Sequence, residues 1–157
     1  MRKLIAMVVV LVCMLTFVAC NHAEQEQVTI YSFRGEHDYF AISNGSFVLS
    51  DTEEVFDGGD LQITQSGVFE AVTSYSTTFY TLTNGEKGII LSNGVIDQTG
   101  GYVNVDGDLG KTSGKGIIIG SKVKSIEELK ENLWFELKTT DLDGTEMVYQ
   151  IRLTLTD

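Results

Sequence analysis

The stretch Met147-Val-Tyr-Gln-Ile-Arg-Leu-Thr-Leu155 has the clearest β-strand pattern in the chain. Its apolar and polar residues alternate, and successive side chains of a strand point to opposite faces of a sheet. The residues expected to point into a core are Met147, Tyr149, Ile151, Leu153 and Leu155. We expect the preceding Trp134–Thr140 stretch to pair with it as a hairpin, because Asp143-Gly144 between them favours a tight turn.

Working back toward the N-terminus, short apolar runs separated by turn residues fill residues 28–157. The further strands expected are Val28–Phe33, Tyr39–Ile42, Phe47–Leu49, Leu61–Ile63, Ser74–Thr83, Ile89–Leu91, Tyr102–Val105 and Ile117–Ile119. The turn signals are Asn44-Gly45, Asn84-Gly85 and Asn93-Gly94, since the favoured two-residue hairpin turn needs positive φ at both positions. About 8–10 short strands spaced in this way predict an all-β protein, an antiparallel β-sandwich or barrel. An immunoglobulin-like sandwich is one such arrangement.

A short helix is expected within this series. Ser125-Ile-Glu-Glu128 has the form of a capping box, in which the serine side chain accepts from the backbone and the glutamate reaches back. Ile126, Leu129 and Leu133 then fall on one helical face. We expect this helix to close one end of the sandwich.

The N-terminus has the layout of a secretory signal peptide: Arg2 and Lys3 precede an apolar run from Leu4 to Ala19. At its end, Phe17-Val18-Ala19-Cys20 resembles the lipobox of bacterial lipoproteins, although Phe17 is bulkier than the usual leucine. The resemblance implies cleavage before Cys20 and attachment of diacylglycerol to its thiol. The alternatives are a plain N-terminal membrane helix and a signal peptide cut elsewhere.

This resemblance divides the chain into three parts: a signal peptide at 1–19, the lipidated Cys20 with a polar tether to residue 27, and a β-sandwich domain at 28–157. An extended tether of this length spans at most about 25 Å, so the domain would sit close to the membrane. The expected location is the extracytoplasmic face of the cell membrane, with the lipid as anchor. Because Cys13 leaves with the signal and Cys20 carries the lipid, the domain would have no free thiol.

The charge of the expected mature chain excludes one class of partner. The whole chain has 157 residues, with 11 basic and 22 acidic side chains. Removal of the 19 leader residues, which include two cations and no acid, leaves 138 residues with 9 basic and 22 acidic side chains. The net charge of the mature chain is then about −13. Such a surface repels phosphate backbones, so nucleic acid is not an expected partner. It also repels anionic lipid, so the acyl chains would have to supply the membrane affinity.

A second resemblance lies at the start of the domain. Tyr31-Ser-Phe-Arg-Gly-Glu36 is similar to the opening of some small Gram-positive lipoproteins that have no assigned activity. Those proteins carry a tryptophan a few residues later, where this chain has Tyr39-Phe40. This resemblance implies no activity, cofactor or ligand.

No motif in the sequence predicts catalysis. His37, between Glu36 and Asp38, is the one histidine of the expected domain, and no Gly-x-Ser-x-Gly elbow presents a serine to it. Gly110-Lys111-Thr112 looks like the end of a phosphate-binding loop, but the required earlier glycine is replaced by Val105. We expect no cofactor and no nucleotide.

A weak calcium site is the remaining metal hypothesis. Asn104-Val-Asp106-Gly-Asp108 places oxygen ligands at alternate positions, as an EF-hand does, but Leu109 and Lys115 stand where the glycine and the bidentate glutamate are needed. Asp106 and Asp108 are therefore only weak ligand candidates, as are Asp57 with Asp60 and Asp141 with Asp143.

Exposed aromatic residues are the last possible binding feature. Any of the following could contribute to a platform for sugars or peptides, although most are expected in the core: Tyr31, Tyr39, Tyr75, Tyr80, Tyr102 and Trp134. The sequence thus favours a non-catalytic binding module for a protein, peptide or cell-wall glycan. The alternatives are an accessory subunit of a cell-envelope complex, working by strand-edge or face contact, and a hydrolase.

Overall fold

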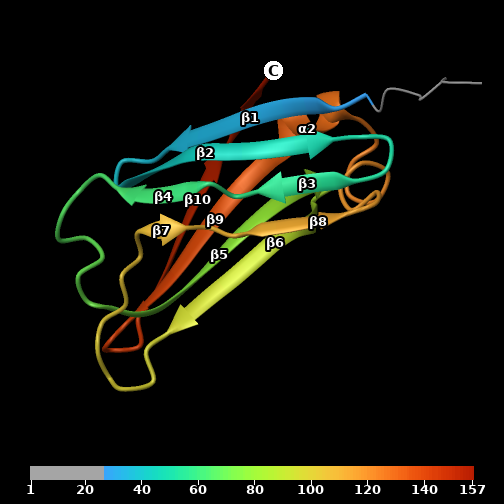
Figure 1. The fold of residues 1–157 in the computed structure, drawn as a ribbon. Helices are drawn as coiled ribbons and strands as arrows, with labels where there is room; N and C mark the ends of the chain where they lie inside the picture. Colours follow the sequence, from blue (N-terminus) through green and yellow to red (C-terminus); the bar gives the residue numbers. More distant parts are fainter. Residues whose placement is uncertain (1–26) are drawn as a thin grey trace, which may run out of the picture.

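The computed structural model describes residues 27–157, which form two antiparallel sheets packed face to face (Figure 1). Sheet A contains β1 (Thr29–Glu36), β2 (Phe40–Leu49), β3 (Glu54–Asp57), β4 (Asp60–Ile63), β7 (Gly107–Asp108), β8 (Lys111–Gly114) and β11 (Thr154–Thr156). Sheet B contains β5 (Val72–Thr83), β6 (Glu86–Ile96), β9 (Leu133–Asp141) and β10 (Glu146–Arg152). Within the described residues the helix is α2 (Ile126–Asn132). The predicted all-β sandwich is confirmed, whereas the signal peptide, Cys20 and most of the tether lie outside the described residues.

The order of the strands differs from the immunoglobulin order. Sheet A runs β11-β1-β2-β3-β8, with β4 paired to the other half of β2 and to β7, and sheet B runs β10-β9-β5-β6. β1, β2 and β3 therefore pair in succession within one sheet. In the immunoglobulin arrangement the chain crosses to the other sheet after its second strand.

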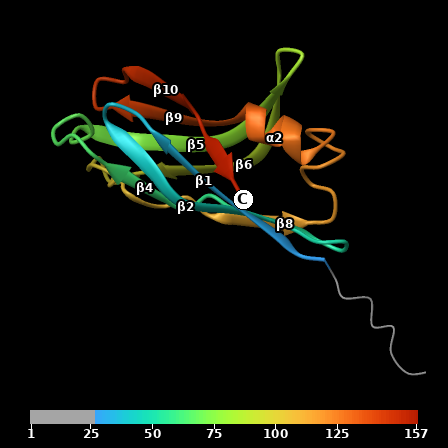
Figure 2. The ribbon, with the colours of Figure 1, turned by 90° about the horizontal axis from the view of Figure 1, so that it is seen from above.

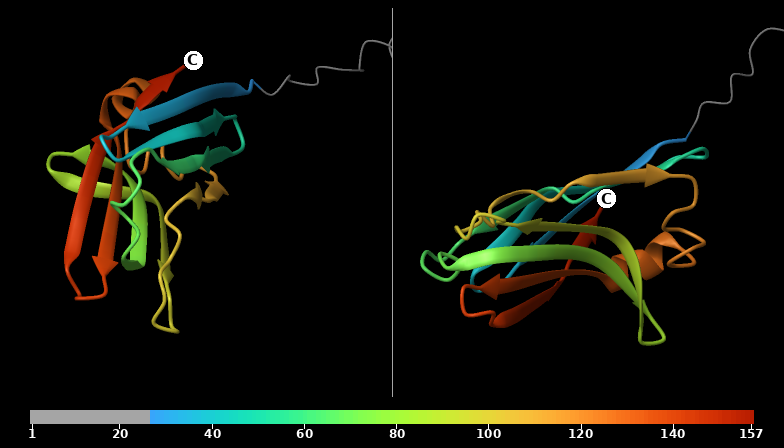
Figure 3. Two further views of the ribbon diagram at one scale, coloured as in Figure 1. Left: turned by 90° about the vertical axis from the view of Figure 1, so that its left-hand side faces the viewer. Right: turned by 90° about the horizontal axis from the view of Figure 1, so that it is seen from below.

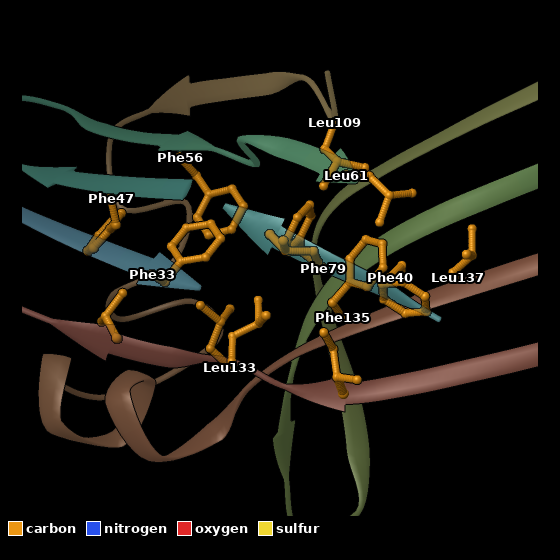
Figure 4. Packing of buried hydrophobic residues seen from close by; sticks show 14 of the residues in the cluster. Phe33, Phe40, Phe47, Phe56, Leu61, Phe79, Leu109, Leu133, Phe135 and Leu137 are labelled. Atoms are coloured by element: carbon orange, nitrogen blue, oxygen red, sulfur yellow. The ribbon is translucent and has the colours of Figure 1, made fainter. Parts of the chain in front are cut away.

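Aromatic rings from both sheets fill the core (Figure 4). Phe33 on β1 and Phe56 on β3 stack with centroids 5.1 Å apart, and Phe79 on β5 meets Phe56 edge-on at 5.1 Å. Phe135 on β9 lies 5.0 Å from Phe79, with the two rings tilted by 54°. These contacts join sheet A to sheet B without a disulfide among the described residues, which contain no cysteine.

The stretch Met147–Leu155 serves both sheets. β10 pairs with β9 in sheet B, and β11 pairs with β1 in sheet A. Leu153 stands between the two strands, is 1% exposed, and donates its N–H to the Leu133 carbonyl at 2.9 Å. The predicted inward set is confirmed except at Met147, which is 52% exposed because it lies at the open end of β10.

Two of the predicted Asn-Gly turns are wrong. Asn84-Gly85 does join β5 to β6, with φ of 54° and 84°. Asn44-Gly45 instead lies inside β2, where Asn44 has φ 60° and the pairing with β1 shifts register between Phe33 and Gly35. A β-bulge, like a turn, favours residues that tolerate positive φ, so the local signal is the same. Asn93-Gly94 likewise lies inside β6.

Two predicted strands are loops. Residues 102–105 are irregular, and 117–119 belong to a turn held by the buried carboxylate of Glu54, which accepts from the Ile118 amide at 2.7 Å. Ile118 is buried, as its apolar neighbours suggested, but this amide bonds to a side chain rather than to a strand. The helix begins as predicted: the Ser125 hydroxyl accepts from the Glu128 amide at 3.4 Å, although the Glu128 carboxylate accepts from Lys124 rather than from Ser125.

Candidate binding surface

The domain has two distinct ends, defined by strand register. Thr29, Leu49, Glu54 and Gly114 lie in one row across sheet A, so the chain enters β1 at the end that carries residues 115–125; we call this the proximal end. At the opposite, distal end lie residues 64–71, 97–106 and 142–145. Figures 1 and 2 show these segments gathered away from the start of β1, and the view from below in Figure 3 agrees.

Exposed apolar side chains concentrate at the distal end. Nine large hydrophobic residues are exposed in the described part of the chain, between 43% and 67%. Six of them lie at the distal end of sheet B, on both faces of its edge strands and in its loops, and together we call them the distal apolar surface: Val95, Ile96, Tyr102, Leu142, Met147 and Val148. Single exposed hydrophobic residues are normal, but their concentration in one region is typical of an interaction surface.

A shallow hollow of about 330 Å³ lies on the outer face of sheet B at this end. Its floor carries small side chains, because Ser74, Ser76 and Gly94 face outward in neighbouring rows. Lys138 and Glu146 border the hollow and form an ion pair at 2.7 Å. The hydroxyl and charged groups that line the hollow can therefore form hydrogen bonds with the backbone or small polar side chains of a bound partner.

A second hollow of about 400 Å³ lies on the inner side of β6, between that strand and residues 105–110. The Asn93 amide group crosses beside it and donates to the Leu109 carbonyl at 2.6 Å. Tyr75 and Thr77 line its wall. Burial raises the pKa of the Tyr75 hydroxyl, which therefore stays protonated and able to donate a hydrogen bond at neutral pH.

The acidic residues considered as calcium ligands hold backbone turns. Asp106 accepts from the Ile63 amide at 2.5 Å, and Asp108 accepts from the Gly110 amide at 2.6 Å. Asp141 accepts from the amides of residues 143 and 145 at 2.9 and 2.8 Å. Across residues 27–157 no three His, Cys, Asp or Glu side chains are grouped so as to hold a metal ion.

Asp57 and Asp60, the second pair of calcium-ligand candidates, contact different partners. Asp57 accepts from the Gly59 amide at 3.0 Å, and one of its oxygens lies 3.8 Å from the Lys111 ammonium. Asp60 accepts from the Asn44 side-chain amide at 2.9 Å. Lys111 begins strand β8, so the Gly110-Lys111-Thr112 sequence enters a strand rather than a helix.

His37 lies in an aromatic environment. Its ring stacks on Phe40 at 4.9 Å with an interplanar angle of 7°, and its Nδ1 accepts from the Tyr39 amide at 3.3 Å. Tyr149 meets the ring edge-on at 5.5 Å. These contacts fix the imidazole at the turn between β1 and β2, where it acts as part of the packing.

Five of the six aromatic residues considered for stacking are buried or partly buried. Tyr31 and Tyr80 are buried, and Lys87 covers the Tyr80 ring with its Nζ 4.4 Å from the centroid. Tyr39, Tyr75 and Trp134 are partly buried. Tyr102, in the loop after β6, is 61% exposed and belongs to the distal apolar surface.

Sequence reasoning missed the open edge of β6. The sequence contains its signal, a run from Gly88 to Ile96 without a charge or a proline, but does not reveal that this strand ends a sheet. It also missed Glu54, which is 5% exposed although the adjacent Glu53 is exposed.

Comparisons with models of protein families, with curated proteins and with solved structures found no match for this chain. Among residues 27–157, no helix reaches the length and apolar character that crossing a bilayer requires.

Proposed function

We propose that this protein is a membrane-anchored extracytoplasmic lipoprotein whose β-sandwich is a non-catalytic binding module. The observation that carries the binding role is the distal apolar surface, which holds six of the nine exposed large hydrophobic residues of the described chain. A lipid on Cys20 would hold the proximal end near the membrane, because the tether joins the domain there. The distal surface would then face away from the bilayer.

The chemistry of this surface favours a polypeptide partner over a glycan. Glycan sites use aromatic faces, and Tyr102 is the one strongly exposed Tyr or Trp among residues 27–157. The other five members of the surface are aliphatic or Met side chains, which pack against the apolar side chains of another protein. An accessory subunit of an envelope complex is the second candidate, because an open strand edge such as that of β6 can also serve assembly.

The anchor is tested with the variant Cys20→Ser. Cells that express the parent protein and are fed a labelled fatty acid should incorporate the label, and cells that express the variant should not. When the same cells are fractionated, the parent protein should be found in the membrane fraction and the variant in the soluble extracytoplasmic fraction. Equal labelling of both proteins, or of neither, would remove the anchor from the proposal.

The binding role is tested by crosslinking in native membranes. The double variant Ile96→Asp, Val148→Asp places two charges in the distal apolar surface, and Ile30→Asp places one on β1, where Ile30 is 60% exposed. Crosslinked products of the parent should persist with Ile30→Asp and disappear with the double variant. Identical products from all three proteins, or turnover of a cell-wall substrate without any partner, would contradict the binding role.

A further inference from the structure

We propose that segment Ser92–Ile96 of β6 receives an added strand from an extended, cationic segment of the partner protein. This inference rests on the proposed function and assigns the partner's chemistry and its mode of binding. Strand addition takes its affinity from backbone hydrogen bonds and its specificity from pockets for alternate side chains. The distal half of β6 offers an open edge and a hollow on its inner side.

The edge of sheet B is open at this segment. β6 ends the sheet and pairs with β5 alone among the described strands. In a covered strand, side chains on at least one face are buried, yet the five consecutive residues from Ser92 to Ile96 are all exposed. Both faces of the segment therefore reach solvent, although the Asn93 side chain bonds to the Leu109 carbonyl on the inner side.

This edge also lacks the features that usually protect one. From Gly88 to Ile96 the strand carries no charged residue and no proline. The other edges in the described fold have shorter uncharged runs: β7, β8 and β11 have 2, 4 and 3 residues, and β10 has only Met147–Ile151 between Glu146 and Arg152. A long, uncharged edge is expected to be covered by a partner strand.

The two hollows lie on opposite faces of the same segment. The hollow of about 400 Å³ is on the inner side, and the hollow of about 330 Å³ is on the outer side; both are lined by Gly94 and Val95. Successive side chains of a strand point to opposite faces. An added strand would therefore direct one set of alternate side chains toward the inner hollow, whereas the outer hollow lies over β5, β9 and β10 and stays beside the added strand.

The charge around the segment selects a cationic partner. Asp97 follows β6 directly and Asp108 lines the inner hollow, whereas Glu146 lies on β10 at the other edge of the sheet. Lys138 is the cation in this region, and Glu146 already pairs with it. A second copy of the chain would bring the same carboxylates together, so a segment with Lys or Arg beside its apolar residues fits better.

The test uses the full-length lipidated protein in detergent and a short synthetic peptide of alternating valine and threonine with a lysine at each end. Binding is measured by fluorescence anisotropy, and backbone protection by hydrogen exchange. The peptide should slow exchange in residues 92–96 while leaving β10 unchanged. The same peptide N-methylated at alternate residues, which keeps its charge but loses backbone donors, should bind at least tenfold more weakly, as should a version with glutamate ends.

Two variants of the protein distinguish peptide binding at the β6 edge from general electrostatic attraction to the acidic domain. Val95→Lys places a charge on the open edge and should abolish protection, whereas Ile30→Lys makes the same change in charge on sheet A and should leave it intact. Equal binding of the N-methylated peptide, or protection spread over other acidic regions, would overturn the proposal. Protection of residues 92–96 that rises with protein concentration in the absence of peptide would assign the edge to a second copy instead.

The two proposals fail in different ways. If the distal crosslinks persist in membranes but the peptide neither binds nor protects β6, strand addition is wrong and the binding role remains. If the crosslinks are absent from the parent protein, the binding role itself is wrong.

Discussion

Glu54 is the buried carboxylate that shapes the proximal end. It accepts from the Ile118 amide at 2.7 Å and from the Ile119 amide at 3.2 Å, and it takes the place that backbone carbonyls would have if residues 117–119 formed a strand. Nothing in the sequence separates it from its exposed neighbour Glu53, because burial depends on residues 60 positions away and more. The pair therefore makes a matched comparison.

The substitution Glu54→Ala leaves these two amides buried without an acceptor. Losing a hydrogen bond to a charged group costs a few kcal/mol, and so does burying an amide that has no hydrogen-bond partner. We expect the free energy of unfolding to fall by about 2–4 kcal/mol. Glu53→Ala, on the adjacent exposed position, should change it by less than about 0.5 kcal/mol. Urea denaturation of both variants gives the comparison, and equal effects would show that the turn does not depend on Glu54.

Glu136 is the residue for which the structure predicts a pH dependence. Burial tends to raise the pKa of its carboxyl, but hydrogen bonds from Lys87 at 2.6 Å and Gln150 at 2.5 Å outweigh burial and lower it below the ordinary value of 4.5. The folded state thus favours the ionised form. This stabilisation is fully present above the ordinary pKa and is lost as the pH falls through the lowered folded pKa.

Glu136→Gln should therefore lose less stability than the parent between about pH 5.5 and pH 3, because the group that becomes protonated is absent. Glu86→Gln, which removes one carboxylate from the hairpin of β5 and β6, controls for the loss of a single negative charge. Chemical denaturation at both pH values measures the difference. If both variants lose as much stability as the parent protein between these pH values, the prediction is wrong and solvent screens the contacts of Glu136.

At the scale of elements, local patterns predict strands well where alternation and turn chemistry agree. The hairpin of β9 and β10 was predicted because its inward residues alternate and Asp143-Gly144 marks its turn. Asn44-Gly45 was misassigned because a bulge inside a long strand and a turn between two short strands need the same positive φ. Only the pairing of β2 with β3 and β4, which meet it on either side of this bulge, separates the two cases.

A substitution of Gly45 tests whether the bulge in β2 requires a glycine at this position. A Cβ at this position would overlap the Phe33 ring, whereas at Gly94 the nearest atom is 3.6 Å from an added Cβ. Gly45→Ala must displace a core ring and should lower the free energy of unfolding by about 1–3 kcal/mol. Gly94→Ala has room and should change it far less. Similar losses in thermal denaturation would mean that the core adjusts around Phe33.

At the scale of the whole molecule, the sequence predicts the class of fold but not the binding surface. Apolar residues of that surface, such as Met147, satisfy the same alternation as the core residues Tyr149 and Ile151. Their exposure depends on which strands end a sheet and on which end carries the loops, and both follow from strand order. The concentration of exposed residues at one end therefore emerges only when the strands are assembled.

The strand that runs from β10 into β11 should make the two sheets unfold together. Leu153 is buried at the crossing and bonds to Leu133, so neither sheet can separate without breaking this contact. Trp134, the one tryptophan in the chain, lies on β9 and reports sheet B by fluorescence, while far-UV circular dichroism reports both sheets. The two signals should change at the same urea concentration.

Leu153→Ala should lower the free energy of unfolding by about 2–5 kcal/mol, as cavity-forming core substitutions do. If the crossing couples the sheets as proposed, part of this coupling should also be lost, and the fluorescence transition should move away from the circular dichroism transition. Leu137→Ala removes an equally buried leucine from the middle of β9 and should destabilise the domain while keeping the transitions together. Separate transitions in the parent protein would contradict the coupling, because each sheet would then hold its fold without the shared strand.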